Sequence, residues 1–395
     1  MLKNKIINVF ILFFLLTIIS CSSNGGEEIA KIEDKDTIAP TIECVGSIEV
    51  EIPILDNAAI VTYSAPIGVD NISAITTQTA GLASGASFPV GVTTNTFVAK
   101  DPSGNTISCS FDVTVTRVND GSTPNFLGTN PGPTDKKWVR IAELSDEFDG
   151  ASIDTEKWHT KGKVTASGWF WEGRPPGLFI EESISVSDGN LKIEADKLPA
   201  TITQNNRNYD YTGGIVRSKA QCKVGWYYEC SMKANKTFMS STFWMMTEEN
   251  ACPKRLELDI QECVGEITPG ADSWVVSGKW DQIFHSNAFH RTSCENKTQT
   301  RKQQGIGVGK NWEDYAVYGF WWKSETELWF YYNGELAYKI ENPTTTFDIP
   351  MYYNLAVETY DWNPPHADGK GMEGLTKDER STQYQWIRTW KLEDI

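Results

Sequence analysis

Short runs of apolar and aromatic residues, each bounded by turn residues, follow one another from Trp138 to Ile395. Stretches with the 3.6-residue period of an amphipathic helix are nearly absent there, so we expect strand after strand. Many short strands over about 250 residues predict an all-β domain, a large sandwich of two curved sheets whose concave face can hold a long linear ligand. The clearest runs are Ile184–Val186, Asn190–Ala195, Trp226–Met232, Ala316–Trp322, Leu328–Tyr332 and Gln385–Leu392.

A smaller β-rich unit, residues 40–117, precedes this region. Its apolar runs, such as Ser47–Ile52 and Thr94–Ala99, alternate with turn signals, and it contains no His and no Trp. Cys44 lies near its first strand and Cys109 near its last, and a disulfide between them would close a loop of roughly 65 residues and contribute roughly 4 kcal/mol. Residues 118–137, rich in Pro, Gly, Asn and Ser/Thr, are predicted to link this unit to the one at 138–395.

The first 20 residues have the pattern of an export signal. Lys3 and Lys5 precede an apolar run from Ile6 to Ile19. The run is about 14 residues long, shorter than the ~20 that a membrane-spanning helix needs, so residues 1–20 are predicted to be a signal peptide. The polar residues 21–39 are predicted to form a flexible tether.

Charge and composition exclude several classes of function. The net charge is −16, whereas nucleic-acid recognition needs basic patches, so nucleic acid is not an expected partner. Eight Cys in an exported chain permit disulfides, but there is no CxxC and the four His show no ligand spacing, so no metal site and no cofactor are expected. The 15 Trp, 14 Tyr and 17 Phe suit both a β-core and stacking on sugar rings.

The run Glu257–Glu262 puts three carboxylates among apolar side chains in one strand-like segment. Side chains alternate along a regular strand, so Glu257 and Asp259 would share a face and Glu262 would point away. One β-bulge near Ile260-Gln261 adds a residue and returns Glu262 to that face. Crowded carboxylates have pKa values that move apart, which suits a retaining glycosidase with a nucleophile and an acid/base roughly 5 Å apart. An acidic strand edge or a calcium site would use the same residue types.

The run matches the E-x-D-x-x-E signature of glycoside hydrolase family 16 in its bulged form, and further segments resemble the family's pattern in order. These are Leu144–Gly150, Asp188–Leu191, Thr212–Lys219, Phe243-Trp244 and Trp386–Arg388. The resemblance covers essentially all of 138–395. It implies a concanavalin A-like β-jelly roll that cuts a β-linked polysaccharide internally and with retention. We expect the protein to be a monomer. Members commonly hold a structural calcium ion near the position of Asp149-Gly150, so a calcium ion there is left open.

Carried over residue by residue, the resemblance assigns roles to the three acids. Glu257 is the expected nucleophile and Glu262 the general acid/base. Asp259 lies between them and is expected to hold their geometry and protonation, so the pH dependence belongs to the coupled set.

The cleft around the acids resembles that of the agarase and porphyranase branch of the family. Trp169–Gly177 is similar to the Trp- and Gly-rich loop that these enzymes place beside the cleft, and the run 285–290 resembles the family's His-bearing strand. An aromatic ring there would stack on a sugar, and an Arg would meet a hydroxyl or a sulfate. The candidate substrate-binding residues are Trp171, Arg174, Trp244, His285 and Asn287.

The expected substrate is a red-algal galactan, agarose or porphyran. Sulfated galactans usually need Arg or Lys in the cleft, and the candidates are Arg174, Arg217 and Arg291. A laminarinase cutting β-1,3-glucan and a carrageenan-type hydrolase are alternatives. A non-catalytic polysaccharide-binding surface lipoprotein is an alternative of another class, although a binder gains nothing from three crowded carboxylates.

Two further resemblances concern the N-terminal part. Residues 40–117 resemble the hyalin repeat, an immunoglobulin-like β-sandwich, which implies a spacer or adhesion role. Ile18–Cys21 resembles a bacterial lipobox, which would make Cys21 the lipidated mature N-terminus, and the acidic residues after it resemble the surface-export signal of Bacteroidetes lipoproteins. The expected location is therefore the cell outer membrane, lipid-anchored and facing outward. The residues that carry the hyalin resemblance are Pro40, Cys44, Asp70-Asn71, Phe88–Gly91, Asp101–Asn105 and Cys109.

The remaining cysteines have separate expectations. Cys252 and Cys294 are candidates to staple two cleft loops. Cys222 and Cys230 flank one strand region, and whether they pair is left open. Cys263 follows the acid run on the core side and is expected to be a buried free thiol.

Overall fold

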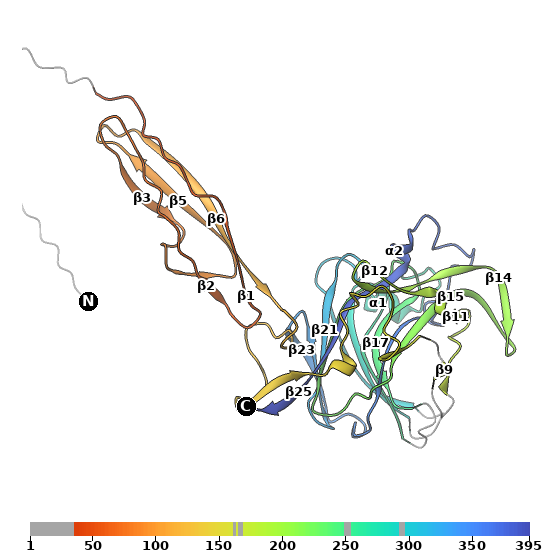
Figure 1. Ribbon diagram of the computed structural model, residues 1–395. Helices are drawn as coiled ribbons and strands as arrows, with labels where there is room; N and C mark the ends of the chain where they lie inside the picture. The colour runs from red at the N-terminus through yellow and green to blue at the C-terminus, as the bar shows by residue number, and fades with distance from the viewer. Residues whose placement is uncertain (1–34, 161–162, 165–168, 249–253, 292–296) are drawn as a thin grey trace, which may run out of the picture. The chain divides into compact units, whose positions relative to one another are not determined.

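The computed structural model describes residues 35–160, 163–164, 169–248, 254–291 and 297–395, which form an N-terminal and a larger C-terminal β-domain (Figure 1). The N-terminal domain contains β1 (Ile48–Pro53), β2 (Ala58–Ile60), β3 (Ile75–Ala80), β4 (Ser87–Pro89), β5 (Gly91–Lys100) and β6 (Thr106–Val118). Four strands form one sheet in the order β1-β6-β5-β3, and β2 pairs with β4. Strand β1 is parallel to β6, and β3 is antiparallel to β5.

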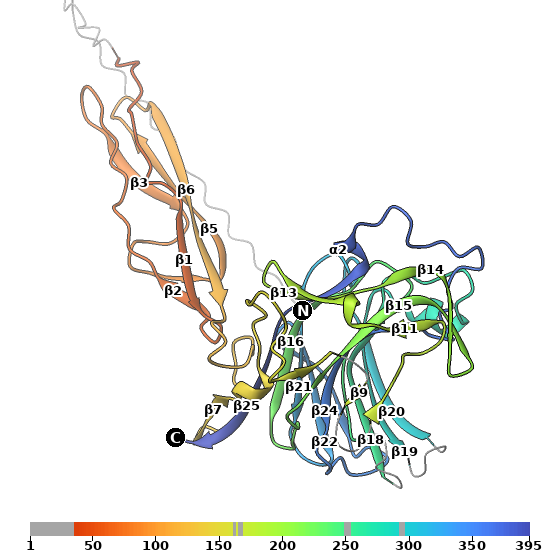
Figure 2. The ribbon, with the colours of Figure 1, turned by 45° about the vertical axis from the view of Figure 1, so that its right-hand side comes forward.

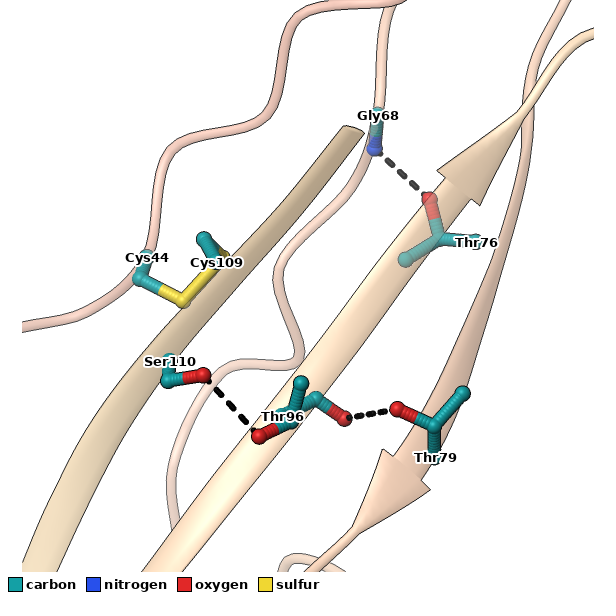
Figure 3. The surroundings of a disulfide bond; sticks show 7 residues. All are labelled: Cys44, Gly68, Thr76, Thr79, Thr96, Cys109 and Ser110. Atoms are coloured by element: carbon teal, nitrogen blue, oxygen red, sulfur yellow. Dashed lines mark hydrogen bonds between the residues drawn. A yellow bond between two sulfur atoms is a disulfide. The ribbon is translucent and has the colours of Figure 1, made fainter. Parts of the chain in front are cut away.

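A disulfide joins the segment before β1 to strand β6 (Figure 3). Cys44 and Cys109 are bonded with an S–S distance of 2.07 Å, as the sequence predicted. Nearby, Thr96 on β5 connects to both neighbouring strands: its Oγ1 lies 2.9 Å from Ser110 Oγ, and its carbonyl accepts a 3.3 Å hydrogen bond from Thr79 Oγ1. These threonine and serine contacts tie the sheet across three strands beside the covalent link.

The C-terminal domain is a sandwich of two large sheets (Figures 1 and 2). Its elements are β7 (Lys136–Arg140), η1 (Ala142–Leu144), β8 (Trp158–His159), β9 (Lys163–Val164), β10 (Trp169–Phe170), β11 (Gly177–Phe179), η2 (Glu181–Ser183), β12 (Ile184–Ser187), β13 (Asn190–Glu194), β14 (Asp196–Gln204), β15 (Arg207–Ser218), β16 (Tyr227–Lys233), β17 (Ser240–Met246), β18 (Arg255–Val264), α1 (Ser273–Gly278), β19 (Ile283–Arg291), β20 (Lys297–Gly305), β21 (Ala316–Trp322), β22 (Glu327–Tyr332), β23 (Glu335–Glu341), β24 (Tyr352–Val357), α2 (Lys377–Arg380) and β25 (Ser381–Asp394). A nine-stranded sheet follows the order β11-β15-β24-β17-β18-β19-β20, with β14 and β8 on β15. An eight-stranded sheet follows β12-β13-β25-β16-β21-β22-β23, with β7 on β25. The strand-rich sequence is therefore confirmed as two stacked sheets.

The main core lies between the two sheets and explains why one side of β18 can carry acids. Leu258 and Ile260 on β18 are fully buried and belong to the same cluster as Phe243 on β17 and Tyr228 on β16. Alternate residues along a strand point to opposite faces, so burying this set leaves the other face of β18 for polar side chains. The thiol of Cys263 is buried and unpaired, as predicted, and so are the thiols of Cys222 and Cys230, whose pairing the sequence left open.

The outer face of the eight-stranded sheet carries a second, aromatic cluster. Tyr227, Trp321 and Trp390 pack there with Phe126, which comes from the segment predicted to be a linker and is 1% exposed. The ring centroids of Phe126 and Tyr227 are 4.7 Å apart. An apolar aromatic surface gains free energy when it is covered, so this part of 118–137 is ordered against the sheet.

Glu229 is buried beside this aromatic cluster, on β16. Its carboxylate accepts the backbone N–H of Asn125 at 3.1–3.2 Å. Burial raises the pKa of Glu229 to about 8, even though the Asn125 N–H and the charge of Arg388 act to lower it. The covering segment therefore seals a carboxyl group that is neutral near pH 7.

Helices are few and short in the described part of the chain. The helix α2 begins with a capping box, in which Thr376 Oγ1 accepts the N–H of Glu379 and the Glu379 carboxylate accepts the N–H of Thr376. No helix among the described residues is long and apolar enough to cross a lipid bilayer. The predicted signal peptide and Cys21 lie outside the described residues.

Candidate active site

A β-bulge on β18 brings the three acids to one cleft. Phe243 on β17 pairs with Gln261, but the next residue, Trp244, pairs with Asp259, so Ile260 is the extra residue. The bulge predicted at Ile260-Gln261 is confirmed. Glu257, Asp259 and Glu262 all line the same cavity.

The cleft has two parts that share the acids. One part, a cavity of about 130 Å³, extends over β17 and the loop before β11. The other, about 310 Å³, extends over β19 and β20. The first is lined by Trp171, Arg174, Trp244, Arg255 and Glu358, and the second by Trp280, His285, Asn287, Arg291, Lys297 and Arg301.

The carboxyls of the acid run differ in protonation. Burial, followed by the negative charges of the two flanking glutamates, raises the pKa of Asp259 well above its usual value. Burial acts in the same direction on Glu262, but His285, the hydroxyl of Tyr360 and the charge of Arg174 outweigh it, so the pKa of Glu262 is lowered. The two pKa values shift in opposite directions, so Asp259 keeps its proton to higher pH than Glu262 does. The pKa values are separated as expected, with the proton on the middle acid.

Hydrogen-bond donors surround the acids. Asn287 Nδ2 donates to Asp259 Oδ2 at 3.2 Å and to Glu262 Oε2 at 3.3 Å. Arg291 Nη1 lies 2.7 Å from Glu257 Oε2, and both side chains are 16% exposed. A calcium site offers oxygen acceptors, so a set of acids held by amide and guanidinium donors fits catalysis better than Ca²⁺ binding.

Two tryptophans form an aromatic wall in the first part of the cleft. Trp171 lies edge-on to Trp244 with ring centroids 5.9 Å apart, and edge-on to Phe179 at 5.0 Å. Trp244 is only 7% exposed, so it mainly supports the more open Trp171. The structure therefore offers Trp171 as the ring with a free surface, and stacking on a sugar stays a prediction for both.

Arg174 is held at the cleft by residues that the sequence did not single out. Its Nε lies 3.0 Å from Glu358 Oε2, and its guanidinium lies 5.2 Å from the ring centre of Tyr360. The charge of Glu358 raises the pKa of Arg174 further, so the guanidinium is always charged. Glu358 and Tyr360 follow β24, about 100 residues after the acid run, and no local pattern marks them as cleft residues.

His285 lies against Glu262 below the cleft surface. It is 1% exposed, its ring lies 4.3 Å from that of Trp280, and its Nδ1 lies 3.5 Å from Glu262 Oε2. Asn287 is 4% exposed and bonded to two of the acids. Both predicted sugar contacts therefore lie in the cleft wall, in direct reach of the carboxyls of the acid run.

The remaining predicted residues are distributed as follows. Arg217 is 3% exposed and lies over the ring of Tyr352 at 4.5 Å, so it is part of the packing and not of the cleft lining. Cys252 and Cys294 lie outside the described residues. Within those residues, the one group of three or more acidic, His or Cys side chains close enough to share a metal ion is Asp36, Asp70 and Asp101 in the N-terminal domain.

Comparison with known proteins identifies this architecture. The family model described as β-porphyranase A–D, GH16 domain, matches residues 138–392. The chain belongs to glycoside hydrolase family 16. A second model, the HYR domain, matches residues 35–115, in agreement with the hyalin-repeat resemblance. The family assignment makes the chain an endo-acting glycoside hydrolase.

Individual relatives agree with this assignment. β-Porphyranase B of Zobellia galactanivorans is 45% identical over 279 residues, which cover 69% of this chain and 91% of that protein. The crystal structure of porphyranase B from the same organism is similar with a TM-score of 0.63 at 43% identity, covering 69% of this chain and 100% of that one. A β-porphyranase of the gut bacterium Bacteroides plebeius is similar with a TM-score of 0.56 at 30% identity, covering 67% and 96%.

Proposed function

We propose that this glycoside hydrolase is a retaining endo-β-galactanase whose substrate is porphyran. The observation that carries the proposal is the bulged strand β18, which lines one cleft with Glu257, Asp259 and Glu262. The substrate class is supported by the relatives that cover the same domain, which are named β-porphyranases. Agarose is the second candidate within the same class of galactan.

In the first half-reaction Glu257 attacks the anomeric carbon while Glu262 protonates the leaving oxygen. The ion pair with Arg291 orients Glu257 for attack. A sugar in the cleft removes water from Glu262, and loss of water raises the pKa of a carboxyl group. Glu262 therefore takes up its proton as substrate binds, and Asp259, which holds a proton and shares the Asn287 amide, is the nearby store.

In the second half-reaction Glu262 acts as a base. Having given up its proton, it is ionised, the state that His285 and Tyr360 favour. It removes a proton from a water molecule that attacks the glycosyl-enzyme and releases Glu257. Two displacements at one carbon leave the configuration unchanged.

Product analysis tests the proposal. Purified protein is incubated with porphyran, agarose, κ-carrageenan and laminarin, and reducing ends and product sizes are measured. Porphyran should be cut first into long fragments, and NMR of the newly formed reducing ends should show the β-anomer before mutarotation. Preferential cleavage of laminarin or carrageenan would refute the galactan assignment, and an α-anomer as first product would refute the retaining mechanism.

We also propose that the chain is exported as a lipoprotein to the outer face of the outer membrane. The support is the apolar run of residues 6–19 followed by Ser20-Cys21 and a polar, acidic tether. Cys21→Ala should move the protein from the membrane to the soluble fraction, whereas Ser22→Ala should not. Continued membrane association of the Cys21→Ala variant would contradict lipidation.

A further inference from the structure

A row of cations lies on the cleft side of the edge strand β20. In the antiparallel pair β19–β20, Arg301 is opposite Asn287 and Lys297 is opposite Arg291. Directly opposite residues in such a pair point to the same face of the sheet. Asn287 bonds to the acids, so Lys297 and Arg301 face the same cleft, and both line its larger part.

These two cations differ from the cleft arginines that the sequence singled out. Arg174 is paired with Glu358 and Arg291 with Glu257. Within the described part of the chain, neither Lys297 nor Arg301 has a carboxylate within ion-pair distance, and both are exposed. In a chain of net charge −16, two cations without an ion-pair partner, four residues apart on one face of an edge strand, leave a local positive field in the cleft.

Packing against an aromatic ring holds Lys297 in place. The ammonium group of Lys297 lies 4.4 Å from the ring centre of Phe289, which is itself 7% exposed and forms part of the cleft floor. The guanidinium of Arg291 lies 5.6 Å from the same ring. A cation held over an aromatic face loses less freedom when it binds an anion than one on a free surface.

Lys297 and Arg301 also lie at a defined distance from the acids along the cleft. Strands are about 4.8 Å apart, so β20 is about 10 Å from the acids on β18, on the side opposite Trp171. This is further than one sugar ring extends from the bond being cut. A group bound there would belong to a sugar beyond the first one on the β20 side.

We propose that Lys297 and Arg301 form a subsite for an anionic substituent, a sulfate ester in porphyran, on a sugar bound on the β20 side of the bond that is cut. Arg301 would bind two oxygens of the sulfate through its planar guanidinium, and Lys297, four residues along the same face of the strand, would add positive charge at longer range. This subsite rests on the proposed function, since it defines which galactan the same cleft prefers.

The test compares a double variant, Lys297→Met/Arg301→Met, with a matched control, Lys302→Met. Lys302 is on the same strand but opposite Ser286, so its side chain points away from the cleft, and it is equally exposed. Values of kcat/KM are measured on porphyran and on the same porphyran after its sulfate groups are removed. The ratio of sulfated to desulfated kcat/KM should fall about tenfold in the double variant, as expected for two solvent-exposed charge contacts, and stay at the wild-type value in the control.

A binding measurement tests the subsite independently of the proposed catalytic function. In affinity gel electrophoresis with porphyran in the gel, wild type should be retarded more than the double variant, with no such difference in agarose. Wild type that cuts no galactan but shows this retardation would refute the proposed function and keep the subsite. The subsite would be overturned if the double variant kept both the wild-type ratio of sulfated to desulfated kcat/KM and the wild-type retardation in porphyran. An equal loss of kcat/KM on the sulfated and the desulfated polymer would overturn it as well.

Discussion

Replacing the buried Glu229 by Gln should stabilise the C-terminal domain at alkaline pH. The pKa of Glu229 is about 8 in the folded protein, against 4.5 for the same carboxyl group in the unfolded chain, because burial disfavours the charged carboxylate. Between pH 4.5 and pH 8 the unfolded chain loses the Glu229 proton and the folded chain keeps it. The free energy of unfolding therefore falls as the pH rises through this range and stays low above pH 8. At 1.36 kcal/mol per pKa unit, the full difference is about 5 kcal/mol.

The substitution Glu229→Gln removes the ionisable carboxyl group and keeps the shape of the side chain. A Gln side chain keeps an oxygen that accepts the Asn125 N–H, and it cannot ionise. The variant and wild type should therefore have similar stability at pH 4.5, and the variant should gain up to about 5 kcal/mol relative to wild type by pH 9. Exposed Glu335→Gln on β23 is the matched control, and its difference from wild type should not change with pH.

The assay is urea unfolding of the full chain followed by tryptophan fluorescence at several pH values. All 15 Trp lie between residues 138 and 395, so the signal reports the C-terminal domain alone. The urea concentration at the midpoint, multiplied by the slope of the unfolding free energy against urea concentration, gives the free energy of unfolding in water at each pH. The reasoning would be refuted if the difference in free energy of unfolding between Glu229→Gln and wild type did not change with pH, or if the variant were less stable than wild type at pH 9. Either result would show that burial does not hold this carboxyl group neutral.

Three further outcomes are expected. Glu257→Gln and Glu262→Gln should each lower kcat by at least 10²–10⁴-fold while far-UV circular dichroism is unchanged, and near-normal rates would remove the catalytic assignment. His285→Phe should raise the pKa of Glu262, because His285 acts to lower it, so the alkaline limb of the kcat/KM profile should move to higher pH; a shift to lower pH would contradict this role. Cys44→Ala/Cys109→Ala should destabilise the N-terminal domain by roughly 4 kcal/mol in calorimetry and leave galactan hydrolysis unchanged, and loss of hydrolysis would mean that the disulfide supports the cleft.

Local patterns in the sequence predicted the acid site because its geometry depends on adjacent residues. Alternation along a strand and one extra residue decide where Glu257, Asp259 and Glu262 point, and both can be read from a six-residue run. The same holds for the disulfide, since Cys44 and Cys109 lie at the ends of one strand-rich unit. The order of the motifs along 138–395 was enough to predict two stacked sheets.

Other parts of the site depend on contacts between distant segments. Glu358 and Tyr360 reach the cleft only because β24 pairs with β17, and nothing near them in the sequence marks them. The protonation of the acids is also a tertiary property, since the proton lies on Asp259 only when His285 and Tyr360 hold Glu262 ionised. Sequence spacing could predict separated pKa values, but not which carboxyl would keep the proton.

The sequence by itself therefore determined the class of fold, the bulged strand that carries the three acids and the class of enzyme, because each follows from the period and order of nearby residues. Only the tertiary structure decided which cations are free to meet a substrate. Arg174 and Arg291 are occupied by carboxylates, Arg217 is buried, and the exposed pair Lys297 and Arg301 faces the cleft. The availability of a charge depends on its neighbours in space, which sheet pairing and packing set, and not on its position along the chain.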